Sequence, residues 1–237
     1  MIKVGIIGGI GPESTLDYYK SIITAYRKIT GDENYPKILI NSINMTEMLS
    51  YVSDENYDQL INLLLNSVRE LKDGGADFAV IASNTPHIVF EKIEKQTPIP
   101  LISIVDETAK KASFLQLKNV LLIGTAFTMK SSFYTDGFRN YNIPIQIPSS
   151  EEQEIIHGII FPDLEEGIVR PEKKIQMLEL CNNIIMNKKC DGIVLGCTEL
   201  PLMLTAEDFA VSVLNTTQIH IDSIVRKFVR DYKRGVS

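Results

Sequence analysis

The chain has 237 residues, of which 44% are hydrophobic and 23% charged, a composition typical of a globular protein with a substantial core. Its 24 Lys and Arg are outnumbered by 30 Asp and Glu, and no basic run is dense enough to follow a nucleic-acid backbone. No stretch approaches the length of a membrane span, and the number of cysteines, three, is odd. We therefore expect no nucleic-acid or membrane partner, and a reducing, cytoplasmic environment rather than a disulfide-stabilised secreted one.

In chain order, short apolar runs alternate with stretches whose apolar residues recur every three or four positions. The first run, residues 1–10, predicts a strand rather than a signal peptide, because Glu13 and Asp17 follow it and no small-residue cleavage site is present. The apolar runs predict strands at 4–8, 38–43, 78–82, 101–105, 120–123, 143–147 and 192–195. The spaced pattern predicts helices at 14–30, 56–74, 106–115, 131–141, 171–188 and 222–232. This alternation predicts an α/β fold with mostly parallel sheets flanked by helices.

The sequence also resembles itself at two nearly equal offsets, 116 and 114 residues. Residues 3–9 resemble residues 119–125, and residues 75–85 resemble residues 189–199 in the same order. Two such matches predict two similar α/β half-domains related by a pseudo-twofold axis, with the active site in the cleft between them. We place the first half-domain at residues 1–101 plus 212–237 and the second at residues 102–211.

The repeat pairs Ser83 with Cys197, each just beyond the end of an equivalent strand. Ligands of such folds bind beyond the carboxyl ends of the strands, so we expect these two side chains to face each other across the cleft. A helix that follows Cys197 would lower its thiol pKa through the N–H groups at its start. The alternative for a cysteine is a buried core position, and we favour it for Cys181 and Cys190.

Residues 5–14 form a glycine-rich strand-to-helix turn, a place where backbone N–H groups often bind anions. The dinucleotide fingerprint G-x-G-x-x-G is not met, and residues 41–44 lack the carboxylate that would bind a ribose. A turn that binds a substrate carboxylate is the better interpretation. We expect no metal, because His87, His157 and His220 are far apart in sequence and no C-x-x-C occurs.

Residues 83–87, Ser-Asn-Thr-Pro-His, offer hydroxyl and amide donors for a bound carboxylate or amine, although helix capping would explain them as well. A Ser-His-Asp triad is disfavoured, since Ser83 lacks the G-x-S-x-G elbow. His87 follows Pro86 in the first turn of the next helix, so we expect it to support its neighbours rather than act as a base.

Three motifs together resemble the aspartate/glutamate racemase family: residues 8–14 (GGIGPES), residues 83–87 (SNTPH) and residues 196–199 (GCTE). The resemblance covers essentially the whole chain. It implies a cofactor-independent enzyme in which one thiolate removes the α-proton of an amino acid and an opposite thiol returns a proton. It also implies a homodimer of two-domain subunits.

The sequence departs from this family pattern at two places. Ser83 occupies the position of the first cysteine, and Met48 stands where aspartate racemases with two cysteines carry an arginine. Members with a hydroxyl residue at the first position exist, so Ser83 does not exclude racemisation. A thiol supplies thiolate near neutral pH and a serine hydroxyl does not, so we expect Cys197 to be the main acid/base and Ser83 a weak opposite group.

The expected function is thus racemisation of aspartate, glutamate or a related amino acid, without a cofactor. Two alternatives stay open: a single-cysteine decarboxylase or isomerase of a small carboxylic acid, and an amino-acid-binding protein that has lost catalysis. Lys130, Arg139 and Arg170 are candidates for binding a second carboxylate, although surface placement would explain each of them. The expected substrate-binding residues are Ile10, Asn84, Thr85, Pro86, Thr125, Thr128, Thr198 and Glu199.

Overall fold

The computed structural model describes residues 2–31 and 33–234, with only the backbone described for residues 231–234. Its strands form two four-stranded sheets in which every pairing is parallel, with orders β2-β1-β3-β4 and β6-β5-β7-β8. The two sheets have the same order of strands along the chain, which confirms the predicted α/β class. The strands are β1 (Lys3–Gly8), β2 (Lys37–Ser42), β3 (Phe78–Ile81), β4 (Leu101–Ile102), β5 (Val120–Ile123), β6 (Ile145–Gln146), β7 (Gly192–Leu195) and β8 (Ser212–Asn215).

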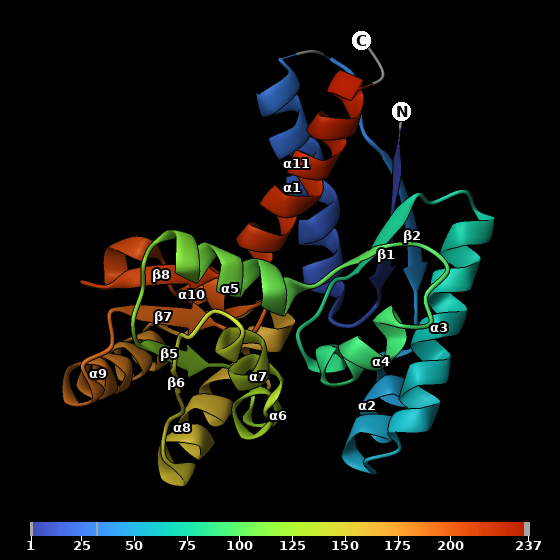
Figure 1. The fold of residues 1–237 in the computed structure, drawn as a ribbon. Coiled ribbons are helices and arrows are strands. Elements are labelled where there is room, and N and C mark those ends of the chain that lie inside the picture. The colour runs from blue at the N-terminus through green and yellow to red at the C-terminus, as the bar shows by residue number, and fades with distance from the viewer. Residues whose placement is uncertain (1, 32, 235–237) are drawn as a thin grey trace. The chain divides into compact units, whose positions relative to one another are not determined.

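Helices separate these strands (Figure 1). The α-helices are α1 (Pro12–Thr30), α2 (Met45–Ser53), α3 (Tyr57–Asp73), α4 (Phe90–Glu94), α5 (Ile104–Phe114), α6 (Ala126–Lys130), α7 (Phe133–Arg139), α8 (Ser150–Ile160), α9 (Pro171–Lys188), α10 (Leu200–Met203) and α11 (Thr216–Arg234). Short 3₁₀ helices are η1 (Thr85–Val89), η2 (Leu164–Glu166) and η3 (Ala206–Asp208).

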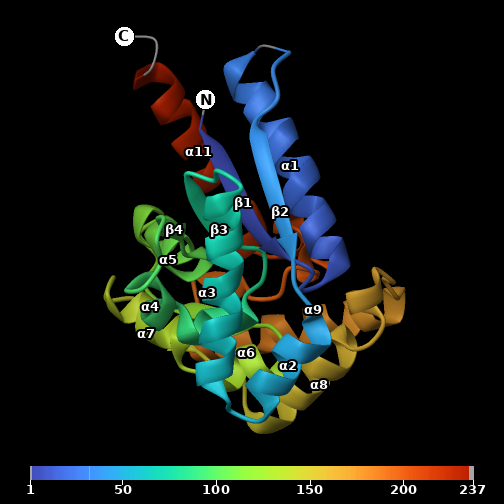
Figure 2. The same ribbon diagram turned by 90° about the vertical axis from the view of Figure 1, so that its right-hand side faces the viewer.

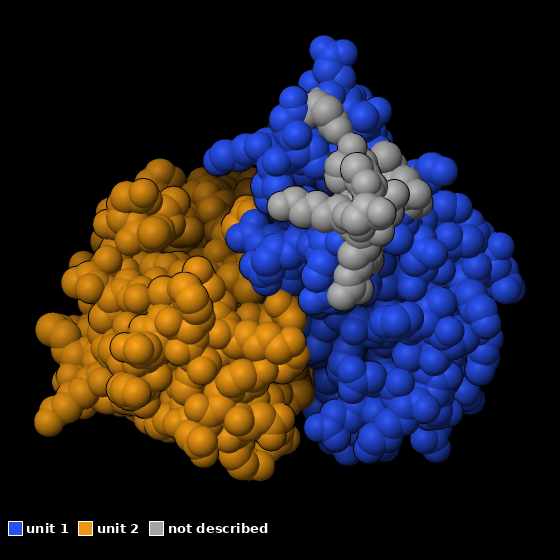
Figure 3. Space-filling model, turned by 45° about the horizontal axis from the view of Figure 1, so that its top comes forward, with its two compact units in different colours: residues 1–104, 220–237 blue, residues 105–219 orange. Residues whose placement is uncertain are grey.

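The chain divides into two compact units, coloured separately in Figure 3: unit 1, residues 1–104 and 220–237, and unit 2, Val105–Ile219. Each sheet lies in one unit. Ser212 of β8 pairs with Gly192 of β7, so the residues directly after 211 belong to the second sheet. The chain enters unit 1 again only at His220, inside α11. The helix after the last strand of each sheet therefore lies mainly in the other unit.

In unit 1, α1 and α11 lie side by side against one face of the sheet, and α3 covers the other (Figures 1 and 2). Tyr18 and Ile22 of α1 pack with Ile224 and Phe228 of α11, and all four side chains are buried. Strands covered on both faces are apolar throughout, and β3 is buried along its whole length.

In unit 2, the largest core cluster joins one face of the sheet to α8, α9 and α10. Ile193 and Leu195 of β7 pack there with Met177 and Cys181 of α9. Cys181 and Cys190 are both buried, which confirms the core positions expected for them. Among the described residues, no helix combines the length and the apolar character required to cross a bilayer.

The sequence analysis predicts no element at the short helices α4, α6 and α10, nor at the two longer helices α2 and α8. Both have a clear N-cap: the Asn44 side chain accepts from the backbone N–H groups of Thr46 and Glu47, and Ser149 forms a reciprocal capping box with Glu152. The predicted strand at 101–105 is shorter than expected, since α5 begins at Ile104. The predicted helix at 131–141 is α7, which begins only at Phe133, after the separate short helix α6.

Candidate functional site

The predicted site residues lie at the carboxyl ends of β1 and β3 in unit 1 and of β5 and β7 in unit 2. Ile10 follows β1, and Ser83, Asn84, Thr85 and Pro86 follow β3, which is hydrogen-bonded to β1. In unit 2, Thr125 and Thr128 follow β5, and Cys197, Thr198 and Glu199 follow β7. Each unit therefore brings its own group of predicted residues to one edge of its sheet.

The glycine turn after β1 is closely packed against the end of β2. Gly9 has a φ of 77°, and a Cβ at this position would lie 2.4 Å from the Ile43 carbonyl oxygen. The Gly9 N–H donates to the Thr15 hydroxyl (2.9 Å), and the Gly11 N–H points to the Met45 sulfur (3.3 Å). Two amides of the turn therefore have partners within unit 1, and the binding of a substrate carboxylate there stays a prediction.

Residues 83–87, here called the Ser83 loop, turn from β3 into η1. Ser83 and Asn84 are buried, and Thr85 is half-buried. A buried hydroxyl of Ser14 in α1 donates to the Ala82 carbonyl (2.9 Å), which fixes the end of β3 just before Ser83. The loop is thus held by α1 as well as by its own helix.

His87 is buried and bonded on both ring nitrogens. Its Nδ1–H donates to the Ser83 carbonyl (3.0 Å), and its Nε2 accepts from the Ile104 N–H (3.3 Å). Burial, with a smaller effect of His220, lowers the pKa of His87 to about 3. A neutral imidazole with both nitrogens engaged is a structural support and not a general base, as the sequence analysis expects.

In unit 2, the ends of β5 and β7 approach each other closely. A Cβ on Gly196 would lie 2.9 Å from the Ile123 carbonyl, to which the Gly196 N–H donates at 2.7 Å. Thr125 is the N-cap of α6, with its hydroxyl accepting from the Thr128 N–H, and the two hydroxyls lie 3.2 Å apart. Thr125 therefore caps helix α6. Binding of a ligand by Thr125 and Thr128 stays a prediction.

Cys197 lies against two carboxylates. Its S–H donates to Glu199 Oε2 at 3.0 Å, and its Sγ lies 3.8 Å from Glu165 Oε1 in η2. The Thr198 hydroxyl donates to the same Glu199 oxygen at 2.8 Å. Cys197 and Glu199 are buried, while Glu165 is half-buried. We call Glu165, Cys197 and Glu199 the thiol–carboxylate cluster.

The surroundings of this cluster favour protonated groups. Burial, Glu199 and Glu165 together raise the pKa of the Cys197 thiol well above its usual value. Burial and the charge of Glu199 raise the pKa of Glu165 to about 7. The expectation of a lowered thiol pKa is therefore wrong for this structure. The helix after Cys197, α10, has only four residues, and the nearest charges are negative.

The three ligand atoms of the thiol–carboxylate cluster lie within 4.8 Å of one another, a spacing that a divalent cation could bridge. The arrangement was not visible from the histidine and cysteine spacings. A cation would have to displace the thiol proton, because only the thiolate is a good metal ligand.

Two residues that interact with Cys197 were missed by sequence reasoning. Glu165 lies 32 positions before Cys197, and its only sequence signal is an acidic pair before Gly167. Tyr134 is buried and interacts with Cys197 electrostatically, while its hydroxyl bonds to Thr216. Thr216 in turn donates to the Leu195 carbonyl (2.7 Å), at the end of the strand that carries Cys197.

The three cationic candidates lie on the surface. Arg139 pairs with Asp136 (2.9 Å), Arg170 pairs with Asp163 (2.6 Å), and Lys130 is exposed. Met48, at the position of the family's arginine, is buried. The interactions of the two arginines are therefore local ion pairs.

Comparison with known proteins gives one consistent result. Residues 7–224 match the family described as Asp/Glu/Hydantoin racemase. The broad specificity amino-acid racemase RacX of Bacillus subtilis is 23% identical over 235 residues, which cover 95% of this chain and 98% of that protein.

Two solved structures extend the comparison. An aspartate racemase homologue from Pyrococcus horikoshii is 34% identical, with a TM-score of 0.85, over 95% of this chain and 98% of the other. The aspartate racemase of Picrophilus torridus is 25% identical, with a TM-score of 0.74, over 96% of this chain and 94% of the other. These relatives bear the names of racemases, which are isomerases, and they confirm the resemblance carried by the three motifs. The chain therefore belongs to the Asp/Glu/hydantoin racemase family.

Proposed function

We propose that the protein is a cofactor-independent racemase of aspartate, glutamate or a related amino acid, with Cys197 as the main acid/base and Ser83 as a weak opposite group. The observation that supports this most is the thiol of Cys197, buried at the end of β7 and hydrogen-bonded to Glu199. Ser83 is at the equivalent strand end of unit 1. The proposal places both side chains in one site, on opposite faces of the substrate α-carbon.

The thiol–carboxylate cluster suggests how Cys197 becomes a base. The ammonium group of an amino acid beside Glu165 and Glu199 would offset their charges and lower the thiol pKa again. The thiol proton then moves along the existing hydrogen bond to Glu199, and the thiolate removes the α-proton of the L-enantiomer. Asn84, Thr85 and Thr198 would donate to the substrate carboxylate, where negative charge develops.

In this proposal Ser83 returns a proton on the other face of the substrate α-carbon. Its hydroxyl, or a water bonded to it, gives a proton to the carbanion and is reprotonated from solvent. This is the harder step, because a serine hydroxyl is a much weaker acid than a thiol. The two enantiomers have equal free energy in water, so kcat/KM is the same in both directions even if the separate kcat values differ.

Met48 stands at the position of the family's arginine, and Arg139 and Arg170 form ion pairs with aspartates on the surface. We propose that the site accepts neutral amino acids as well as aspartate and glutamate. A relative, RacX, is named as a broad specificity racemase.

The test is proton NMR of L- and D-aspartate, L- and D-glutamate and a panel of neutral amino acids in deuterated buffer. The α-proton signal should disappear with wild-type protein and persist with Cys197→Ala. The signal of the D-enantiomers, whose α-proton faces residue 83, should disappear about tenfold faster with Ser83→Cys, because a thiol replaces the weaker acid/base group. Absence of α-deuteration for every amino acid would overturn the proposal.

One observation favours a second candidate function. Of the three cysteines, only Cys197 follows the carboxyl end of a strand, so the proposed site has one thiol available for catalysis. A single thiol suffices to protonate the carbanion left by decarboxylation of a malonate-type acid. Release of carbon dioxide from such an acid, without α-deuteration of amino acids, would favour this function. Binding of an amino acid without either reaction would indicate a binding protein.

We further propose that the enzyme is a cytoplasmic homodimer. Leu16 and Tyr19 on α1 and Ile40 on the edge strand β2 are exposed apolar side chains. Burial of such side chains against a second copy is favourable. Light scattering should give a dimer mass that Tyr19→Glu reduces to that of a monomer, whereas Phe114→Glu, on α5, should leave it unchanged. A monomeric wild type would contradict the proposal.

A further inference from the structure

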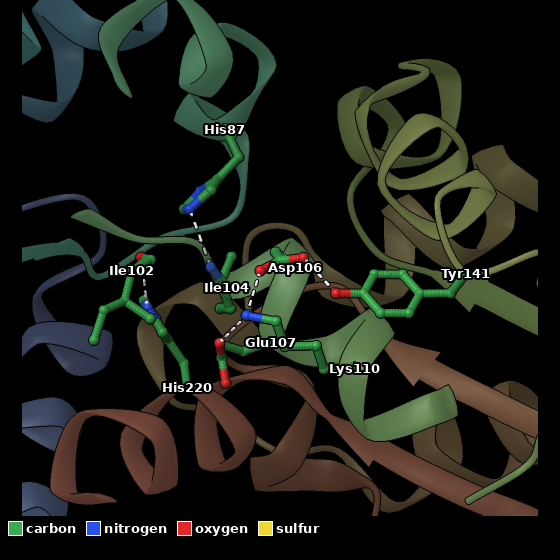
Figure 4. Close-up of polar contacts among 8 residues, drawn as sticks. All are labelled: His87, Ile102, Ile104, Asp106, Glu107, Lys110, Tyr141 and His220. Carbon is green, nitrogen blue, oxygen red and sulfur yellow. Dashed lines mark hydrogen bonds and ion pairs between the residues drawn. The ribbon is translucent and has the colours of Figure 1, made fainter. Parts of the chain in front are cut away.

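Two buried histidines contact the segment by which the chain leaves unit 1. This segment, residues 102–104, runs from the end of β4 to the start of α5 and is here called the exit segment. His87 accepts from the Ile104 N–H at 3.3 Å, and His220 Nε2–H donates to the Ile102 carbonyl at 3.0 Å (Figure 4). The exit segment is thus bonded from both the Ser83 loop and α11.

Each histidine has a second partner that fixes its tautomer. The Ser83 carbonyl can only accept, so His87 carries its proton on Nδ1. The Ile102 carbonyl can only accept, so His220 carries its proton on Nε2, and its Nδ1 accepts from the Tyr18 hydroxyl at 2.8 Å. The two rings must therefore be opposite tautomers.

Both rings stay uncharged near neutral pH. His220 is fully buried, and burial lowers its pKa to about 4, while the pKa of His87 falls to about 3. His87 also stacks on Phe90, with ring centroids 5.0 Å apart and an interplanar angle of 6°. Rotation of the ring would break this stacking and both hydrogen bonds.

The chain beyond the exit segment is bonded through Asp106 to another part of unit 2. The Tyr141 hydroxyl donates to Asp106 at 2.8 Å, and Lys110 binds Asp106 and Glu107 at 2.7 and 2.8 Å (Figure 4). The free chain between the two anchored stretches is therefore very short. His87 links the exit segment directly to the Ser83 loop, because it bonds both the Ile104 N–H and the Ser83 carbonyl.

We propose that His87 is a positioning residue for Ser83, which it links to the exit segment through Ile104, and that His220 holds the same segment at Ile102. This inference rests on the proposed function for its consequence in catalysis, and on geometry alone for its hydrogen bonds. It gives His87 a role in the step that uses Ser83 rather than in the step that uses Cys197.

The first experiment reads the hydrogen bonds without any substrate. The sequence contains only three histidines, so ¹⁵N-imidazole NMR gives a simple spectrum, assigned with His87→Asn, His157→Gln and His220→Asn. We expect an Nδ1–H tautomer for His87 and an Nε2–H tautomer for His220, both neutral at pH 6. A charged ring or the reverse tautomer at either position would overturn the inference, whatever the enzyme's activity.

The second experiment separates the two bonds of His87. An Asn amide can replace Nδ1 and keep the bond to Ser83, whereas a Gln reaches the position of Nε2 and keeps the bond to Ile104. Amide hydrogen exchange at Ile104 should become about tenfold faster in His87→Asn and change little in His87→Gln. His157→Gln, in α8, is the control and should change neither.

The third readout concerns catalysis in deuterated buffer. With L-substrate, deuteration with retention needs only Cys197, whereas inversion also needs Ser83. Both His87 variants should reduce inversion about tenfold relative to retention, because either lost bond breaks the link. An unchanged ratio, with folded variants, would overturn the role in positioning. If wild-type protein shows neither reaction, the proposed function fails. The tautomers and the amide exchange at Ile104 then still test whether His87 connects Ser83 to the exit segment.

Discussion

The two strand-end loops, after β3 in unit 1 and after β7 in unit 2, occupy equivalent places in two sheets of the same order, yet their chemistry differs. In unit 1, Ser83 is supported by an uncharged His87. In unit 2, Cys197 is flanked by Glu165 and Glu199, one of them half-buried with a raised pKa. The repeated fold thus supplies two equivalent positions of unequal acid/base strength, because one carries a hydroxyl and the other a thiol, and the neighbouring carboxylates raise the pKa of that thiol. Four predictions test this difference, from the largest effect to the smallest.

The largest effect is expected from Cys197→Ser, which makes the two strand ends alike. Loss of the thiol removes the base, and α-deuteration should fall about 1000-fold or more. Exchange is measured by NMR, with Cys190→Ser as the matched control, since Cys190 is a core residue away from the strand end. Exchange that survives in Cys197→Ser would mean that another group is the base.

A smaller effect is expected when the carboxylates are neutralised one at a time. Glu199→Gln should lower the Cys197 pKa by about one unit or more, because a negative charge and its hydrogen bond are removed. Glu165→Gln should have a weaker effect, since this group lies farther from the sulfur and has a pKa of about 7. The pH dependence of Cys197 alkylation, followed by peptide mass spectrometry, gives both values. A higher thiol pKa in Glu199→Gln would contradict the assigned cause.

The neutral histidines of unit 1 predict a loss of stability in acid. Their pKa values are about 3 and 4 in the folded protein, so an unfolded chain binds protons below about pH 6.5 that the folded chain does not. The free energy of unfolding should fall by up to about 1.4 kcal/mol per pH unit for each histidine as pH drops toward 4.

The groups that face these rings are the backbone of Ser83 and Asn84, the Ile102 carbonyl, the Ile104 N–H, the Tyr18 side chain and the rings of each other and of Phe90. None of them is a carboxylate that could stabilise a charged ring. Urea unfolding at pH 7 and pH 5 measures the slope, which should be shallower in His220→Asn than in wild type. An equal slope in both would show that His220 does not contribute.

The smallest effect is expected at the helix cap that follows β5. Thr125→Ala removes the side-chain acceptor for the Thr128 N–H and should destabilise the protein by about 0.5–2 kcal/mol. Thermal unfolding measures it, and Thr125→Ser should restore most of the loss. If Thr125→Ala left stability unchanged but raised KM, ligand binding rather than capping would be the main role of this hydroxyl.

Most of the fold follows from local sequence signals. Fully apolar runs such as the one at β3 predict buried parallel strands, and the repetition of sequence between the two halves predicts two similar sheets. Helix α8 was not predicted from periodicity, although Ser149 and Glu152 form a capping box at its start. Periodicity and capping signals must therefore be weighed together.

The site was predictable only in part. Cys197 and Ser83 stand out because each ends an equivalent apolar strand. The raised thiol pKa was not predictable, because it depends on burial of the thiol, on a Glu199 side chain that turns toward the sulfur, and on Glu165, which η2 brings beside it from a distant part of the sequence. Likewise, the positions of His87 and His220 in the sequence do not indicate that both side chains bond to the exit segment. Motifs identify the reacting groups, whereas the fold sets their ionisation.

The assignment of α11 to unit 1 has a consequence for synthesis on the ribosome. Val105–Ile219 is one uninterrupted stretch, so unit 2 has all its core residues as soon as this stretch has emerged. Residues 1–104 emerge earlier but lack Ile224 and Phe228, which pack against Tyr18 and Tyr26. Unit 1, although its first 104 residues are synthesised first, can complete its core only when α11 has emerged. Unit 2 can therefore complete its folding before unit 1.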